Sequence, residues 1–279
     1  MSDLMFLESI FKEQSWGGDA FIKTFEYEIL NHRTGEAYVI SGISDADLKI
    51  KNGKFKNLNL GSVYRRNRHL FNNLKSDKFP YLVRLLDVNE DIGVEVHSEV
   101  AKAYYVLDAK KDAKILIGHG ALSKEELKHN LNELMIERPV SKGDFIYVPA
   151  GVAYALLKGV LMMELRLSSG KTFTASEQEA EFMSTVSVPS FDEKIAHKTF
   201  LLDASRITQF LDKKAFTVEK WEIRDVLDLE NKSFKMMSVI SGKGFINGTK
   251  LKKGEHLIIL SDTKHIQLEG NMELIVSYL

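Results

Sequence analysis

Cysteine is absent from this 279-residue chain, which excludes disulfide bonds and thiolate metal ligands. Proline is scarce, with four residues in total. No uninterrupted apolar run approaches the roughly 18 residues that a membrane-spanning helix needs. An excess of one charge is also missing, because 38 Lys and Arg offset 39 Asp and Glu. We therefore expect neither nucleic acid nor a membrane as a partner, and nothing here identifies a protein partner.

The N-terminal stretch MSDLMFLESIFKEQSW carries acidic residues among its apolar ones. A signal peptide would instead have a basic start and a continuous apolar segment. We therefore expect a cytoplasmic protein. The sequence also contains no glycine-rich phosphate loop and no nucleophile elbow.

Short runs of β-branched, aromatic and aliphatic residues between turn residues dominate the chain and predict a mostly β protein. The clearest runs are FIYVPAG, GVLMMELRL, FKMMSVISG, HLIIL and ELIVSYL. Helices are predicted over 4–14, 62–74 and 123–134. The last has a capping box of Ser123 and Glu126, with Leu122 and Leu127 placed for a hydrophobic staple.

One turn pattern occurs twice: VSKGDFIYV at 140–148 and LKKGEHLII at 251–259. In both, Lys-Gly-acid leads into an apolar strand, as expected where glycine permits a tight turn. The repeat favours two related β units, although such turns are also common in unrelated β proteins. A boundary is expected near 187–198, which mixes Pro189, serines and charges. The predicted units are 1–190, with helical additions, and 191–279.

Glu95 and His97 lie two residues apart in a predicted strand, so both side chains point to one face. A carboxylate and an imidazole on one face can begin a metal site, and they can equally form an exposed polar face. Lys102 begins another apparent strand, where a solvated side chain is common. Tyr154 reads as a core residue, and Glu164 with Arg166 as a surface ion pair worth under about 1 kcal/mol.

Longer segments place these residues in a family context. SWGGDAF, TGEAYVISG, KFPYLVRLLDVNEDIGVEVH, LSKEELKHNL, VSKGDFIYVPAGVAYAL, GVLMMELRLSSGKTF and KKGEHLIIL occur in the order found in bacterial class I mannose-6-phosphate isomerases. The chain resembles this family from Trp16 to Leu279. The resemblance implies two cupin-like, jelly-roll β units, of which the second and smaller carries no metal. It also implies zinc-dependent interconversion of mannose 6-phosphate and fructose 6-phosphate.

The chain departs from the family at the zinc ligands, which the resemblance places in a Gln-x-His pair, a glutamate and a second histidine. The matching positions here are Glu95 with His97, then Lys102, then Tyr154. A family arginine near the reaction centre corresponds to Thr174, and the loop after the Gln-x-His pair is shorter. A lysine cation repels a divalent metal, and tyrosine is a poor replacement for imidazole. Zinc is therefore expected to be absent or weakly bound, with Glu95 and His97 as the remaining ligands.

Three functions stay open at this point. The chain is a divergent relative with impaired or lost isomerase activity that still binds a sugar phosphate, an active isomerase with a rebuilt site, or a protein with a filled barrel that serves a structural or partner-binding role. In an active enzyme, Glu95, Lys102 or Tyr154 would supply the catalytic base. An open pocket around His97 favours the first two functions. We also expect Lys102 to pair with Glu95, within about 4 Å directly or through a water, in place of the metal.

Overall fold

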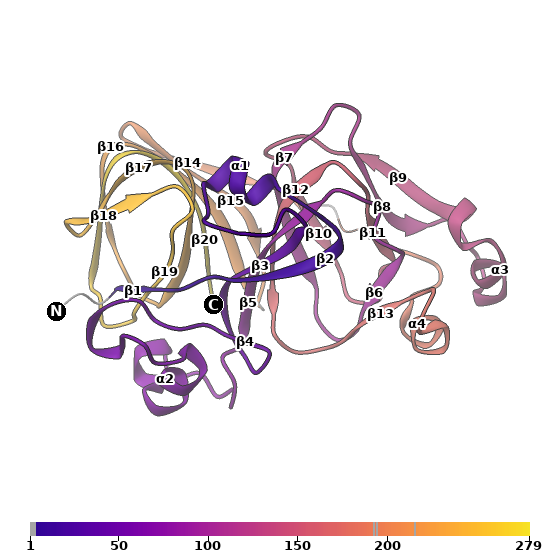
Figure 1. Ribbon diagram of the computed structural model, residues 1–279, viewed down its shortest axis with the longest axis horizontal. Helices are drawn as coiled ribbons and strands as arrows, with labels where there is room; N and C mark the ends of the chain where they lie inside the picture. Colours follow the sequence, from indigo (N-terminus) through magenta and orange to yellow (C-terminus); the bar gives the residue numbers. More distant parts are fainter. Residues whose placement is uncertain (1–3, 192, 194, 215) are drawn as a thin grey trace.

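The computed structural model describes residues 4–191, 193, 195–214 and 216–279 and is built mostly of strands. Two β units lie beside each other along the long axis of the molecule (Figure 1). The mostly β, cupin-like prediction is confirmed. In the part of the chain described here, no helix is long and apolar enough to cross a membrane.

The strands form three sheets. The eight-stranded sheet of the C-terminal unit contains β1 Leu4–Phe6, β14 Lys198–Leu202, β15 Ser205–Asp212, β16 Thr217–Glu230, β17 Lys235–Ile246, β18 Thr249–Lys252, β19 His256–Ile259 and β20 His265–Tyr278. The seven-stranded sheet contains β2 Ile10–Gly18, β3 Thr34–Ile43, β4 Ala46–Asp47, β5 Tyr81–Val88, β7 Lys102–Ala109, β10 Phe145–Val148 and β12 Val160–Leu167. The five-stranded sheet contains β6 Glu95–His97, β8 Lys114–His119, β9 Met135–Pro139, β11 Tyr154–Leu156 and β13 Thr172–Thr174.

Short helices decorate the sheets: α1 Ala20–Phe25, α2 Leu60–Arg66, α3 Lys124–Leu134, α4 Glu179–Thr185, and the 3-10 turns η1 Gly53–Phe55 and η2 Arg68–Phe71. The predicted helix at 123–134 is confirmed, and the Ser123 hydroxyl accepts from the Glu126 amide at 3.1 Å. The staple is wrong, because Leu122 is 84% exposed. The predicted helix at 62–74 is broken at Asn67, which ends α2 and precedes η2.

The predicted helix at 4–14 is wrong, because these residues belong to β1 and β2. Their amphipathic spacing was outweighed by long-range pairing, since β1 adds an antiparallel strand to β19, about 250 residues away along the chain. The N-terminus is thereby tied to the C-terminal sheet, whereas β2 pairs with β3 in the other unit.

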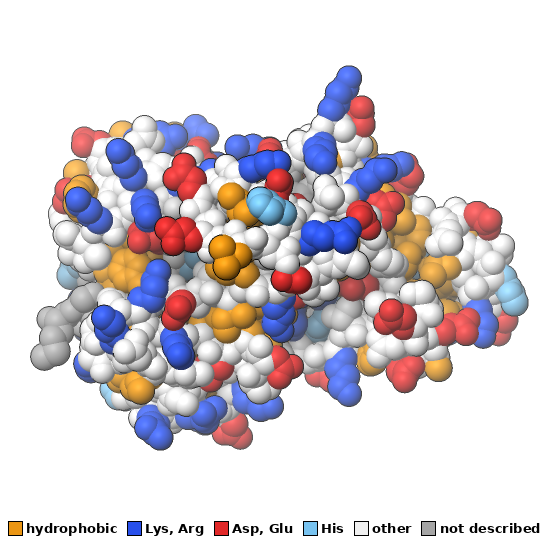
Figure 2. Space-filling view, in the orientation of Figure 1, with side chains coloured by type: hydrophobic (Ala, Val, Ile, Leu, Met, Phe, Trp, Pro, Cys, Tyr) orange, Lys and Arg blue, Asp and Glu red, His pale blue; other side chains and the backbone are white. Residues whose placement is uncertain are grey.

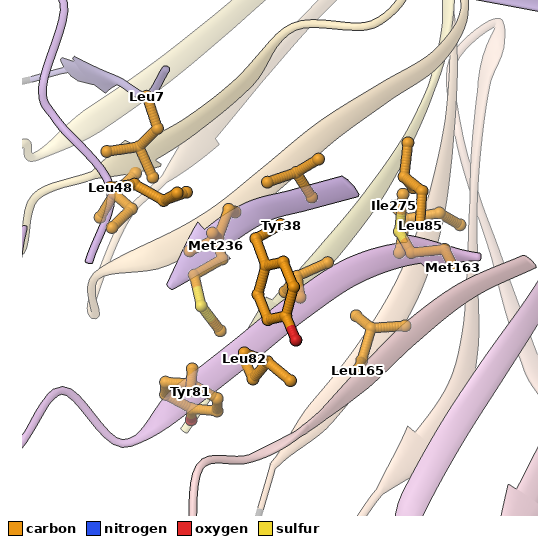
Figure 3. Close-up of a cluster of buried hydrophobic side chains, with 14 of the residues drawn as sticks. Leu7, Tyr38, Leu48, Tyr81, Leu82, Leu85, Met163, Leu165, Met236 and Ile275 are labelled. Carbon is orange, nitrogen blue, oxygen red and sulfur yellow. The ribbon is translucent and has the colours of Figure 1, made fainter. Parts of the chain in front are cut away.

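A shared hydrophobic core joins the two units. Figure 3 shows Tyr38, Leu85 and Met163 of the seven-stranded sheet together with Met236 and Ile275 of the C-terminal sheet. The division at 190 and 191 stays a prediction. Asp192 and Lys194, inside the predicted boundary segment, lie outside the described residues.

The repeated Lys-Gly-acid pattern forms two equivalent turns. Gly143 and Gly254 have φ of 95° and 86°, which glycine adopts with least strain. The carboxylates of Asp144 and Glu255 each accept from the backbone amide three residues earlier, at 2.8 and 2.9 Å. Each turn then leads into a buried strand, β10 or β19. This local equivalence supports the interpretation of the pattern as a structural repeat.

Candidate functional site

The strand pairing brings the four predicted site residues together. Tyr154 on β11 lies opposite Glu95 on β6, and His97 lies opposite Thr172 on β13. The Tyr154 hydroxyl donates to Glu95 Oε2 at 2.6 Å and accepts from Lys102 Nζ at 2.5 Å. Side chains from three strands, β6, β7 and β11, therefore meet at one point inside the N-terminal unit.

Lys102 is fully buried. Its side chain is 0% exposed, so the alternative of a solvated lysine is wrong. Besides Tyr154, its ammonium group donates to Thr172 Oγ1 at 3.2 Å and lies 3.5 Å from Glu164 Oε1. A buried ammonium group needs such partners, because leaving it unpaired away from water costs several kcal/mol.

The prediction that Glu164 and Arg166 form a surface pair is wrong. Glu164 is 0% exposed and Arg166 is 15% exposed, with 3.3 Å between Arg166 Nε and Glu164 Oε1. Arg84 on β5 contacts the other oxygen of Glu164 and also pairs with Glu36 on β3. The strands β7, β12, β5 and β3 are neighbours in the sheet in this order, and their polar side chains form one row across it. Strand alternation alone could not distinguish this inward row from an outward one.

These charged residues form one network that balances its charges. Its members, called the barrel network below, are Glu36, Glu95, Glu164, Arg84, Lys102 and Arg166, together with Tyr154 as a neutral bridge. Three carboxylates therefore face three cations. This balance allows charged side chains to be enclosed in a β structure.

The pKa shifts follow from burial and from these pairings. Burial alone would raise the pKa of Glu164, but Arg84, Lys102 and Arg166 outweigh it and hold that pKa well below the usual range. Burial lowers the pKa of Lys102, while Glu164 and Glu95 oppose the shift. Burial also raises the pKa of Tyr154 far above its usual value, so its hydroxyl keeps its proton and can donate to Glu95.

The predicted direct Glu95–Lys102 ion pair is wrong. Among the described residues the ion-pair partner of Lys102 is Glu164, and Glu95 reaches Lys102 through the Tyr154 hydroxyl. The physical reason is the register of β12 and β7, where Arg166 lies opposite Lys102 and Glu164 follows on the same face. Tyr154 fills the space between the two predicted partners.

His97 lies beside this network without a hydrogen bond from its ring. It is 1% exposed, and both ring nitrogens lack a partner among the described residues. Burial lowers its pKa to about 4, and the positive charges of Lys102 and Arg166 add to the shift. Gly170, with φ of 80°, leaves room for the ring, since a Cβ there would lie 2.6 Å from His97 Cε1. The imidazole is therefore neutral at pH 7.

The residues at the four ligand positions do not fit a zinc ion. Zinc takes three or four nitrogen, oxygen or sulfur ligands in tetrahedral geometry. Only Glu95 and His97 offer a carboxylate and an imidazole, and one Glu95 oxygen accepts from Tyr154. The described part of the chain contains no group of three or more His, Asp or Glu residues arranged to hold a metal. Lys102 brings a cation to the centre instead.

Thr174 on β13, which the resemblance places at the position of the family arginine, lies opposite Glu95 on β6, and its buried hydroxyl has no partner among the described residues. It supplies no positive charge. The arginines that do lie inside the unit, Arg84 and Arg166, are engaged with Glu164. Sequence inspection missed Arg84 and Glu36, because the segments that carry the family resemblance contain both residues without marking either as part of the site. Their only signal was a charge within an otherwise apolar strand.

Five cavities in the part of the chain that the structure describes, with volumes of about 280 to 990 Å³, have linings that contain neither His97 nor Lys102. On the face of the molecule that Figure 2 shows, charged side chains of both signs are mixed, and no patch carries one sign alone. The side chains of Lys102, Tyr154 and His97 are at most 2% exposed. Three of the four ligand positions are therefore closed to solvent, whereas Glu95 is half-buried.

Comparisons with known proteins agree with this geometry at the level of the fold. Residues 4–116 match the model of the type I phosphomannose isomerase catalytic domain, and residues 206–279 match that of the mannose-6-phosphate isomerase cupin domain. Mannose-6-phosphate isomerase ManA of Bacillus subtilis is 32% identical over 99% of this chain and 98% of its own length. Mannose-6-phosphate isomerase of Streptococcus mutans is 32% identical over 100% of this chain and 99% of its own. A crystal structure of mannose 6-phosphate isomerase from Bacillus subtilis superposes with a TM-score of 0.95 at 30% identity, covering 99% of both chains.

Proposed function

The chain belongs to the type I mannose-6-phosphate isomerase family, and we propose that it is a divergent member that has lost zinc-dependent isomerase activity and still recognises a sugar phosphate. The observation that carries the proposed loss is the Lys102 ammonium group. It is fully buried at a family ligand position and is bound to Tyr154 and Glu164.

The loss follows from what isomerisation requires. The family reaction needs an electrophile to polarise the sugar carbonyl and a base to move a proton between two neighbouring carbons. Glu95 and Lys102 are each engaged with Tyr154, and Tyr154 keeps its proton. None of these three groups is free to act as a catalytic base. The Lys102 ammonium group also cannot take the place of a Lewis-acid metal ion.

Retention of sugar-phosphate recognition rests on the family. The relatives are named for mannose 6-phosphate, and the similarity covers the whole chain. The burial of His97, Lys102 and Tyr154 argues for binding outside the centre of the N-terminal unit.

Two alternatives each have one observation in their favour. His97, with both ring nitrogens unpartnered among the described residues, favours an active enzyme with a rebuilt metal site. The complete burial of Lys102 and Tyr154 favours a filled barrel with a structural or partner-binding role. The first alternative predicts zinc binding that depends on His97, and the second predicts no sugar-phosphate binding.

Calorimetric titration with zinc tests the proposed loss. The unmodified protein should show no stoichiometric zinc binding, whereas the triple variant Glu95→Gln, Lys102→Glu and Tyr154→His should bind one zinc ion. The control is the quadruple variant, in which His97→Ala is added to the triple variant. It should lose that binding. Stoichiometric zinc in the unmodified protein that disappears in His97→Ala alone would contradict the proposal.

A further inference from the structure

A cleft of about 390 Å³ lies between the two β units, away from the barrel network. Its walls come from α1, β7, β17, β20 and the two repeated turns. Lysines project from three separate segments: Lys23 from α1, Lys142 from the first turn and Lys253 from the second. We call this the inter-unit cleft.

The repeated turns explain why two of these lysines meet. Lys142 and Lys253 hold the same place in the pattern, directly before Gly143 and Gly254. The Gly143 amide donates to Val106 at 2.8 Å, so the first turn is anchored to β7. The second turn is anchored in the same way to β17, and each lysine is thereby delivered to the cleft from its own unit.

The lining of the cleft carries more positive than negative charge, with three lysines and two carboxylates. In the described part of the chain, neither Lys142 nor Lys253 has an acidic group within ion-pair distance, whereas Lys23 lies 2.8 Å from Asp19. Two acids line the cleft. Glu273 is already paired with Lys220 at 3.1 Å, which leaves Asp108 as the opposing charge. The two turn lysines thus remain available to an anion.

The rest of the lining suits a small polar molecule with a ring. Phe25 and Tyr105, which are at most 6% exposed, also line the cleft, together with Thr24 and Ser241, which carry hydroxyl groups. The volume lies within the range of about 300 to 1,000 Å³ typical of small-molecule sites. Lysine ammonium groups bind phosphate oxygens as mobile point charges.

We infer that the inter-unit cleft binds a phosphomonoester, with its phosphate between Lys142 and Lys253 and its organic part over Tyr105. The identity of the organic part as a sugar rests on the proposed function, but the phosphate contact does not. Because the two lysines come from different units, the bound anion would also hold the units together.

Titration calorimetry on the full chain tests this inference with two probes, inorganic phosphate and mannose 6-phosphate. Lys142→Gln/Lys253→Gln should weaken mannose 6-phosphate binding at least tenfold. The matched control, Lys75→Gln/Lys78→Gln, removes the same charge from an exposed loop outside the cleft and should leave the affinity unchanged. Circular dichroism of both variants verifies that they are folded.

The outcomes separate this inference from the proposed function. Mannose 6-phosphate binding that is equal in both double variants and the unmodified protein would overturn the cleft site and leave sugar-phosphate recognition intact. Equal weakening in both variants would show a general charge effect and would also overturn it. Binding of phosphate without mannose 6-phosphate, lost only in the cleft variant, would support the site and contradict recognition of this sugar. Absence of binding by both probes would overturn both proposals.

Discussion

Replacing Glu164 by glutamine removes a carboxylate that contacts three cations, Arg84, Lys102 and Arg166. The amide has nearly the same shape, so the change removes charge with little change in packing. Arg84 retains Glu36, but Lys102 loses its one ion-pair partner among the described residues and keeps its hydrogen bonds to the Tyr154 and Thr172 hydroxyls.

The expected loss of unfolding free energy is about 3–5 kcal/mol, the cost typical of breaking a buried ion pair by removing one partner. That is a large part of the roughly 5–15 kcal/mol that stabilises an ordinary domain. Because the pKa of Glu164 is depressed in the folded state, its contribution is present at neutral pH. This contribution is lost as the pH falls below about 4.3, the unfolded value for glutamate. Glu164→Gln should therefore flatten the acid limb of stability against pH.

Urea unfolding at pH 7, followed by circular dichroism, measures the effect. Glu137→Gln is the matched control, because Glu137 pairs with Lys114 at 2.5 Å but the two side chains are 59% and 43% exposed. This control should lose less than about 1 kcal/mol. Adding Lys102→Met to Glu164→Gln should recover part of the loss, since it removes the unpaired cation. A Glu164→Gln variant as stable as the control would refute the barrel network.

The repeated turns and the buried histidines give two further predictions. Gly143→Ala and Gly254→Ala should each lose about 1–3 kcal/mol of urea-unfolding stability, because both glycines have positive φ. Gly254→Ala should lose more, since its Cβ would lie 3.0 Å from Tyr27, and equal losses would contradict this. In the second prediction, stability should fall as the pH drops from about 6.5 towards 4, because unfolded His97 takes up a proton and the folded residue, with its pKa lowered to about 4, does not. His97→Gln should reduce this slope, measured by thermal unfolding against pH. What remains reflects His256, whose pKa is lowered to about 3, and His119 and His197, whose pKa values are also lowered by burial. An unchanged slope would count against a neutral, buried His97.

Local signals in the sequence predicted much of the fold. The short runs of β-branched, aromatic and aliphatic residues predicted strands, the capping box predicted α3, and the Lys-Gly-acid pattern predicted two matching turns. The failures came from long-range pairing. The segment 4–14 has helical spacing, yet β1 is held by β19, and no local signal reports a partner so distant along the chain.

The candidate site shows the same division. The strand period placed Glu95 and His97 near each other, and the family resemblance added Lys102 and Tyr154, all of which the fold brings together. The ion-pair partner of Lys102 was not predictable, because it depends on the register between β7 and β12. A one-residue shift of that register would have turned Glu164 to the opposite face.

The most direct test of the account is an assay for conversion of mannose 6-phosphate to fructose 6-phosphate by the purified, folded protein, with zinc, manganese and cobalt each supplied. A buried ammonium group at a ligand position predicts no turnover above the metal-free control with any of the three metals. Metal-dependent turnover that falls sharply in His97→Ala would contradict the account and would establish an active isomerase with a rebuilt site.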